Sequence, residues 1–419
     1  MNITGIIAEY NPFHNGHAYH LSCAKKKTEA DFLIAVMSGN FIQRGAPALL
    51  DKSVRAKMAL LGGADLVIEL PPLWSCASAQ YFASAGVALL NQLGCVNALC
   101  YGCETPDSDL ISVISGITVN EPAAYRKLLT DFQKKGSSYA SARQKALTRL
   151  LKKEDEKAVA QILEHPNNIL ALEYTKAVTD MHSSIKLFPV SRKGAGYHSK
   201  SIRGDLISAT AIRMVLKKTA DSDFSLHEIK RAMPDYAYKL LNDWKRTSPF
   251  IFSNAVSQML HYCLLKNERE GYARFADCTP DFSNKILRHL NEYTDFDSFC
   301  MLLKSKDTAY TRISRALLHI LLDIQKEDYA TWRALSYAPY ARILGFKKQA
   351  APLLTQLKRH ASIPLITKAS DAKKTFTGQT MQFFQKHLLA DSIYRALTVQ
   401  TGAGSRPLPD EYRRQLVII

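Results

Sequence analysis

Two histidines near the start of the chain, His14 and His17, could take part in chemistry, and their spacing could place both side chains in one site. They flank a glycine, follow a short apolar run and precede a helix-like segment, which leaves three roles open: metal ligands, core residues or parts of a phosphate site. Zinc sites usually add further cysteine or acidic ligands, and only Glu9 is near, beyond a proline. A core role fits poorly, because Asn15-Gly16 marks an exposed turn.

The phosphate role needs a strand, a tight turn and the start of a helix, and the sequence offers all three. The first N–H groups of a helix carry partial positive charge and lack partners within the helix, which suits phosphate. Gly16 would let phosphate groups approach the backbone closely, and two imidazoles could donate hydrogen bonds to charge that develops on a phosphoryl group. The sequence therefore predicts a phosphate site in which His14 and His17 are catalytic.

Strand and helix patterns alternate around this site through the first half of the chain. Short apolar runs predict strands over residues 3–8, 32–37, 66–70, 96–101 and 185–190, and other segments predict helices over 17–27, 52–61 and 80–93. Such a series is typical of a parallel sheet with helices on both faces, which binds ligands beyond the carboxyl ends of its strands. This rule selects the loops 9–16, 38–45 and 102–107 and the segment after residue 70.

Beyond about residue 216 the strand patterns fade, and helical periodicity appears over segments such as 254–266, 310–325 and 352–360. We therefore expect an α/β fold with a parallel sheet in residues 1–215, followed by a mainly α-helical domain in residues 216–419. The chain carries a net charge of +17, and the excess of basic residues is larger in the second part. Such an excess favours a polyanionic partner, either nucleic acid or a membrane surface.

The sequence favours a cytoplasmic protein that does not cross a membrane. The first basic residue is Lys25, too late for a secretion signal, and the longest uncharged run, 70–103, contains prolines and polar amides that do not suit lipid. Eight cysteines without such a signal indicate reduced thiols. Cys95, Cys100 and Cys103 resemble part of an iron–sulfur spacing, but small packing residues of a buried strand are the better interpretation, so we expect no metal ligands.

Two stretches resemble the signatures of the HIGH-motif nucleotidyltransferase superfamily. These are His14-Asn15-Gly16-His17 and Ile207-Ser208-Ala209-Thr210-Ala211-Ile212-Arg213. A wider set of segments, 5–17, 37–45, 166–174 and 194–198, is similar to one family within it, the bacterial tRNA(Met) cytidine acetate ligases. Beyond residue 215 the resemblance is general, to a basic and helical half. The lysine-rich loop of aminoacyl-tRNA synthetases is absent, which argues against that branch.

The resemblance implies a Rossmann-like nucleotidyltransferase domain and an ATP-dependent ligase. Members of this family use ATP and acetate to make N4-acetylcytidine at the wobble position of elongator tRNA(Met). The chemistry agrees, because attack of acetate on the α-phosphate gives acetyl-adenylate, from which AMP leaves readily when the cytidine N4 amine attacks. A magnesium ion on the triphosphate is expected, although the sequence shows no dedicated protein ligand for it.

The resemblance also assigns roles residue by residue. The residues expected to bind ATP are Ile7, Ala8, Glu9, Tyr10, Asn11, Pro12, Phe13, His14, Asn15, Gly16, His17, His20, Gly102, Asn167, Asn168, Arg192, Ser208, Thr210 and Arg213. A polar loop after the second strand, with Asn40, Gln43 and Arg44, would meet acetate or the target base. Simpler roles stay open for some of these: Gly102 as a plain turn, one of the two adjacent asparagines as a helix cap, and Ser208 as the cap of the helix that follows.

Basic residues of the second half are the candidates for contacts with the tRNA backbone. They are Lys217, Lys218, Arg342, Lys347, Lys348, Lys358, Arg359, Lys373 and Lys374, with Tyr340 or Phe346 as candidates for base stacking. Any one of them alone is more often a solvated charge or a core aromatic, so only the summed charge is informative. The sequence gives no sign of a protein partner.

Two other interpretations stay open. An adenylyltransferase that joins AMP to a small phosphorylated metabolite would use both signatures but leaves the basic second half unexplained. An RNA-binding protein without enzymatic activity would explain the excess of basic residues but would give the two signature segments no function. The sequence does not show which tRNA is chosen, nor the oligomeric state.

Overall fold

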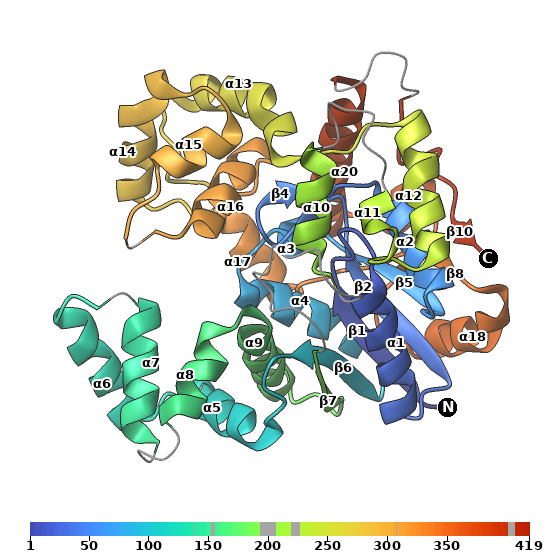
Figure 1. Ribbon diagram of the computed structural model, residues 1–419, viewed down its shortest axis with the longest axis horizontal. Helices are drawn as coiled ribbons and strands as arrows, with labels where there is room; N and C mark the ends of the chain where they lie inside the picture. Colours follow the sequence, from blue (N-terminus) through green and yellow to red (C-terminus); the bar gives the residue numbers. More distant parts are fainter. Residues whose placement is uncertain (138, 152–155, 193–206, 219–226, 307, 401–406) are drawn as a thin grey trace.

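A computed structural model describes residues 1–137, 139–151, 156–192, 207–218, 227–306, 308–400 and 407–419. One sheet organises these residues (Figure 1), with the strand order β10-β8-β5-β2-β1-β6-β7 and with β9 paired to β8. The strands are β1 Ile3–Ala8, β2 Phe32–Ser38, β5 Leu66–Leu70, β6 Ala98–Cys103, β7 Lys186–Ser191, β8 Ala341–Phe346, β9 Leu365–Ile366 and β10 Val417–Ile418. A separate antiparallel pair consists of β3 (Phe41–Ile42) and β4 (Ala46–Pro47).

The strands predicted in the first half are confirmed to within two residues, and so is their parallel arrangement. β1 pairs in parallel with β2 on one side and β6 on the other, β6 continues to β7, and β2 continues to β5. Their carboxyl ends therefore meet at one edge of the sheet, where the loops selected from the sequence begin. Cys100 and Cys103 are buried within β6, which agrees with their interpretation as packing residues.

Alternate residues of each strand face two separate cores, because successive side chains of a strand point to opposite faces. Ile34 and Val36 of β2 pack with α3 (Pro72–Ser75), α4 (Ala79–Gln92) and α9 (Pro166–Asp180). Ala35 and Met37 pack on the other face with α1 (Asn15–Lys27), α2 (Lys52–Leu61), α10 (Ala209–Lys218), α11 (His227–Lys230) and α12 (Asp235–Thr247). The helices predicted to cover both faces are confirmed.

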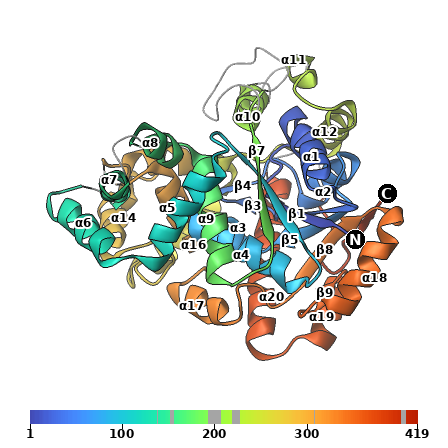
Figure 2. The ribbon, with the colours of Figure 1, turned by 90° about the horizontal axis from the view of Figure 1, so that it is seen from below.

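The second half of the chain is mainly helical, as predicted, but it also completes the sheet. β8 pairs antiparallel with β5 and in parallel with β9 and β10. The helices α18 (Ala351–His360), α19 (Ala369–Thr375) and α20 (Gly378–Gln400) belong to this part, at the β8 edge of the sheet (Figure 2). The sheet thus crosses the expected boundary at residue 215, and that boundary stays a prediction.

Two groups of helices extend from the sheet toward the same side of the molecule, away from α1 and α18 (Figure 1). The first contains α5 (Ser108–Asn120), α6 (Ala123–Lys134), α7 (Tyr139–Leu150) and α8 (Glu156–Glu164). The second contains α13 (Ser257–Asn267), α14 (Pro280–His289), α15 (Phe296–Leu302), α16 (Tyr310–Leu321) and α17 (Lys326–Ala334). Within the described part of the chain, no helix has the length and apolar character needed to cross a membrane.

Candidate functional site

A pocket lies at the carboxyl edge of the sheet, beyond the ends of β1, β6 and β7. Most of the residues predicted to bind ATP line it, and so do two residues of the loop after β2. These lining residues are Ile7, Ala8, Glu9, Tyr10, Asn11, His14, Gly16, His17, His20, Gly102, Asn167, Arg192, Ser208, Thr210 and Arg213, with Gln43 and Arg44 from the loop. The segment 194–198, quoted above for its resemblance, lies outside the described residues.

The backbone at the start of α1 fixes both histidines. His14 caps the helix: its Nδ1 accepts a hydrogen bond from the N–H of Gly16 at 3.0 Å, and Nδ1 of His17 accepts one from the N–H of His14 at 3.2 Å. Because each Nδ1 accepts, the proton of each neutral ring is assigned to Nε2. The two rings are stacked with their centroids 3.8 Å apart. One short stretch of the pocket wall therefore presents two Nε2–H donors.

Enclosure by protein keeps these imidazoles neutral. Burial is the largest cause that lowers the pKa of His14 to about 3 and that of His20 to about 4, and the guanidinium of Arg192 adds to both shifts. The pKa of His17 also lies well below its ordinary value, because of burial and the neighbouring His14. Neutral rings can donate hydrogen bonds to an anion while the positive charge of the site comes from arginines.

Two arginines from separate elements bring that charge to the pocket. Arg213 of α10 donates from Nη1 to the carbonyl of Asn11 at 2.6 Å and from Nη2 to the hydroxyl of Thr210 at 3.2 Å. Arg192 follows directly after β7. Ser208 accepts a hydrogen bond from the N–H of Ala211 at 3.2 Å, which confirms its role as a helix cap, and it also lines the pocket. Guanidinium groups beside neutral donors suit the oxygens of a triphosphate.

The two adjacent asparagines at the start of α9 have different positions. Asn167 lines the pocket, and its amide nitrogen donates to Oε1 of Glu104 at 2.5 Å. Asn168 is fully buried, and its Oδ1 accepts from the N–H groups of Glu104 and Thr105 at 2.9 and 3.0 Å. Asn168 therefore holds the loop that follows β6 and shapes the pocket wall near Gly102. The structure does not bring it to the pocket itself.

Four further predicted site residues are not among those that line the pocket: Pro12, Phe13, Asn15 and Asn40. Phe13 is fully buried, and its ring centroid lies 5.5 Å from that of His17. Asn15 donates from its side chain to a backbone carbonyl that precedes α12. Asn40 is 1% exposed and donates to Asp391 at 3.1 Å, so its amide belongs to a buried cluster and not to a ligand contact.

The rest of the wall is largely apolar and aromatic, which sequence reasoning did not identify as part of a site. The additional lining residues are Tyr19, Phe82, Tyr101, Leu170, Tyr174, Val190, Ser191, Ile207 and Ala209. Tyr101 directly precedes Gly102, and the segments that carried the resemblance contain Leu170, Tyr174, Ile207 and Ala209. Those positions were the available signals. Flat aromatic and apolar walls with a few fixed polar groups are typical of sites for nucleobases and other small ligands.

The predicted tRNA contacts separate into exposed and buried residues. Those that are exposed, and stay predictions, are Lys217, Lys218, Lys348, Lys358, Arg359, Lys373 and Lys374. Lys347 is half-buried and lies 3.5 Å from Asp65. Arg342 is 4% exposed among buried carboxylates, and Tyr340 is 1% exposed with its ring stacked on Phe376. The predictions of RNA contacts for Arg342 and Tyr340 are therefore wrong, because neither side chain reaches the surface.

Comparison with known proteins agrees with this fold. The family model described as HIGH Nucleotidyl Transferase matches residues 1–406, so the class indicated by the two signatures extends over nearly the whole chain. The crystal structure of apo Thermotoga maritima TmcAL superposes with a TM-score of 0.93 over 100% of both chains, at 28% identity. A second structure of that protein, bound with alpha-thio ATP, has a TM-score of 0.86 over 95% of both chains, at 29% identity.

Curated relatives narrow the class to one family. The tRNA(Met) cytidine acetate ligase of Clostridium perfringens is 40% identical over 89% of this chain and 91% of its own length. The ligase of the same name from Alkaliphilus metalliredigens is 35% identical over 99% of this chain and 100% of its own length. The chain belongs to the tRNA(Met) cytidine acetate ligase family.

Proposed function

We propose that this chain uses ATP to activate acetate and transfers the acetyl group to N4 of the wobble cytidine of elongator tRNA(Met), releasing AMP and pyrophosphate. The observation that carries the proposal is the pocket in which the Nε2–H donors of His14 and His17 stand with two arginines at the carboxyl edge of the sheet. The relatives that carry this ligase name, and the structure of one member bound with alpha-thio ATP, support it.

In the first step of the proposal an acetate oxygen attacks the α-phosphorus of ATP, and the bond to the β-phosphate oxygen breaks. Negative charge grows on the phosphate oxygens, where His14, His17, Arg192 and Arg213 donate hydrogen bonds and neutralise charge. In the second step the cytidine N4 amine attacks the acetyl carbonyl carbon. AMP leaves, and the amine loses its proton as the amide forms. The chain mainly positions the reactants and stabilises charge.

The acceptor side of the pocket is assigned to the loop after β2. Gln43 and Arg44 line the pocket next to Glu9, whose Oε1 accepts a hydrogen bond from the N–H of Gln43 at 2.9 Å. We place acetate and the target base at this loop. Exposed lysines and arginines of the second half would hold the tRNA backbone, and the wobble base must leave its stack to reach the adenylate. A cytoplasmic location belongs to the same proposal, because the substrates are ATP and tRNA.

Magnesium enters the proposal only with the nucleotide. Among the described residues that line the pocket, Glu9 is the one carboxylate, and Gln43 already donates to it. Neutral histidines and arginines fit phosphate oxygens and do not form the oxygen-rich set that Mg²⁺ prefers. Phosphate oxygens and water would therefore hold the ion, which would neutralise part of the triphosphate charge.

The test is an incubation of the purified chain with ATP, acetate and total bacterial tRNA, followed by mass spectrometry of the digested nucleosides. N4-acetylcytidine should form only when ATP and acetate are both present. Pyrophosphate release that depends on neither acetate nor tRNA would instead support an adenylyltransferase acting on a small metabolite. ATP binding without any turnover would support an RNA-binding role on this scaffold.

A further inference from the structure

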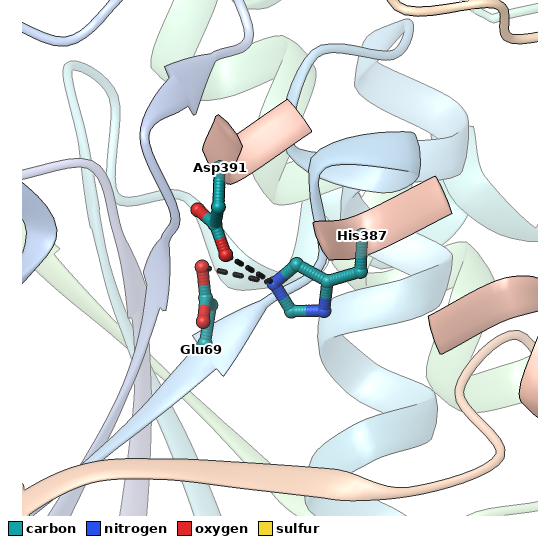
Figure 3. Close-up of side chains that lie close together, drawn as sticks. All are labelled: Glu69, His387 and Asp391. Atoms are coloured by element: carbon teal, nitrogen blue, oxygen red, sulfur yellow. Dashed lines mark ion pairs between the residues drawn. The ribbon is translucent and has the colours of Figure 1, made fainter. Parts of the chain in front are cut away.

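A cluster of charged side chains lies buried between β5, β8 and α20, outside the pocket. Its centre is the ammonium of Lys52, which lies 2.9 Å from both carboxylate oxygens of Glu69 and 2.5 Å from Oδ2 of Asp391. Figure 3 shows three members: Glu69 on β5 facing His387 and Asp391 on α20. Nε2 of His387 lies 3.1 Å from Glu69 and 3.7 Å from Asp391. All four side chains are at most 1% exposed.

The three residues in Figure 3 are close enough to ligate a metal, since one ligand atom from each lies within 4.8 Å of the others. Cations of the chain itself, however, already neutralise both carboxylates. The Lys52 ammonium bonds to both of them, and the guanidinium of Arg342 lies 3.2 Å from Asp391 and 3.7 Å from Glu69. The cluster is therefore a buried ion-pair network.

Asn40 connects this network to the loop after β2. Its Nδ2 donates to Oδ1 of Asp391 at 3.1 Å, and its Oδ1 accepts from the backbone N–H of Lys52 at 2.8 Å. Because the other oxygen of Asp391 accepts from the ammonium of Lys52, the three residues close a ring of hydrogen bonds in which every member is buried. The amide of Asn40 has one possible orientation in this ring.

The loop that Asn40 anchors is the one that brings Gln43 and Arg44 to the pocket. Its backbone lies directly on the network: a Cβ atom at Gly39 would stand 2.3 Å from Oε1 of Glu69, so glycine is required for this approach. Asn40 precedes the lining residues Gln43 and Arg44 by only three and four positions along the chain. A shift of the ring would therefore move those side chains.

Two further contacts from the end of the chain hold the segment between this loop and α2. The hydroxyl of Tyr394 on α20 donates to the carbonyl of Ala48 at 2.9 Å. Arg414 donates to both carboxylate oxygens of Asp51, the cap of α2, at 2.6 and 3.0 Å. Residues after position 390 thus hold the segment 40–51 at three points: Asn40, Ala48 and Asp51.

We propose that Asn40 and Asp391 are positioning residues for the acceptor side of the reaction. Together with Lys52 they hold Gln43 and Arg44 where acetate and the target cytidine bind, an inference that rests on the proposed function. The residues proposed to bind the nucleotide lie at the start of α1, on β6, directly after β7, on α9 and on α10, and none of them belongs to the ring. Disturbing the ring should therefore weaken the use of acetate or tRNA while ATP still binds.

The test compares full-length variants by their KM for acetate, their KM for tRNA and their Kd for ATP. Asn40→Asp places a second carboxylate beside Asp391, and Asp391→Asn removes a carboxylate from Lys52. Each should raise the KM for acetate or for tRNA about tenfold and change the Kd for ATP less than about twofold. The double variant Asn40→Asp/Asp391→Asn reverses one hydrogen bond and keeps the number of charges. It should restore the KM to within about threefold of the unmodified chain.

Asp328→Asn is the matched control, because Asp328 of α17 also pairs with a lysine, Lys386 of α20 at 2.5 Å, but neither residue belongs to the Asn40 ring or to the three anchors of segment 40–51. It should lower the melting temperature and leave the three constants unchanged. If Asp391→Asn does not fold, Asn40→Ala, which keeps every charge, gives the same readout. Folded ring variants with an unaltered KM for acetate and for tRNA, or with an equal loss of ATP binding, would overturn the positioning role. Absence of N4-acetylcytidine with the unmodified chain would instead refute the proposed function.

Discussion

The turn before α1 and the loop after β2 both reach the pocket, but they are held in different ways. In the turn, His14 and His17 are fixed by backbone N–H groups two and three positions away. In the loop, Asn40 is fixed by Asp391, 351 positions later in the chain. One pocket therefore combines a part that local sequence specifies with a part that only the complete fold specifies.

The two regions also differ in the kind of group they use. The turn relies on neutral imidazoles whose hydrogen bonds stay within one helix end, so a substitution there should affect chemistry more than folding. The loop relies on buried charges, for which loss of one partner leaves another uncompensated. Three predictions test the two sides of this contrast, and a fourth concerns a surface outside both regions, in order of decreasing expected effect.

Removing the ammonium at the centre of the network should have the largest effect. Lys52→Met leaves the buried carboxylates facing one another, so the free energy of unfolding should fall by about 3–5 kcal/mol. The control is Lys217→Met, which breaks a pair with Asp297 at 3.2 Å in which the lysine side chain is 55% exposed. That variant should lose less than about 1 kcal/mol. Denaturant unfolding measures both, and equally small losses would contradict the supporting role of the network.

Substitutions in the turn should stop the chemistry while the fold persists. His14→Asn and His17→Asn keep a short acceptor for the N–H groups that the Nδ1 atoms now bind, but they remove the Nε2–H donors. We expect kcat to fall about 10²–10³-fold with little change in melting temperature or in tRNA affinity. Steady-state kinetics and tRNA binding separate these effects. Loss of tRNA binding would show that the histidines are structural.

Acidification should destabilise the fold through the buried histidines at the start of the chain. Burial lowers the pKa of His14 to about 3 and that of His20 to about 4, whereas an unfolded histidine titrates near 6.5. Between these values the unfolded chain binds more protons, so the free energy of unfolding should fall from pH 7 to pH 5, by on the order of 2 kcal/mol for each such histidine. His20→Gln should remove one of these contributions. Unfolding curves identical for both chains across this range would contradict a neutral His20.

The exposed basic residues of α18 should give the smallest effect, since they belong to neither region. Lys358→Ala/Arg359→Ala removes two charges that the proposed function assigns to the tRNA backbone. The Kd for tRNA should rise severalfold, and the slope of log Kd against log salt should become shallower by about one to two. Binding measured between low and physiological salt tests this. An unchanged slope would remove these two residues from the RNA surface.

The strands, the histidine turn and the cap of α10 could be predicted because their signals are local. Ser208 accepts a hydrogen bond from the N–H of Ala211, only three positions away. A strand followed by glycine and a helix start likewise needs only about 25 consecutive residues to be visible. The nucleotide side of the pocket could be predicted from the sequence for this reason.

The acceptor side was less predictable because its determinants are distant in sequence. A basic residue in a basic half looks the same whether it is solvated or paired. Arg342 was assigned to the surface, although its partners Asp391 and Glu411 lie 49 and 69 positions away. Asn40 was assigned to the ligand for the same reason. Aromatic residues such as Tyr174 resemble core residues until the pocket beside them is known.

The ring through Asn40 also has a consequence for the order in which a newly made chain acquires its parts. A ribosome adds about 5–20 residues per second, so Asn40 and Lys52 leave it roughly 20–70 seconds before Asp391 does. The histidine turn and Arg213 are present long before that moment. A nascent chain can therefore complete its nucleotide side first, while its acceptor loop lacks the bond between Asn40 and Asp391 until α20 has been synthesised.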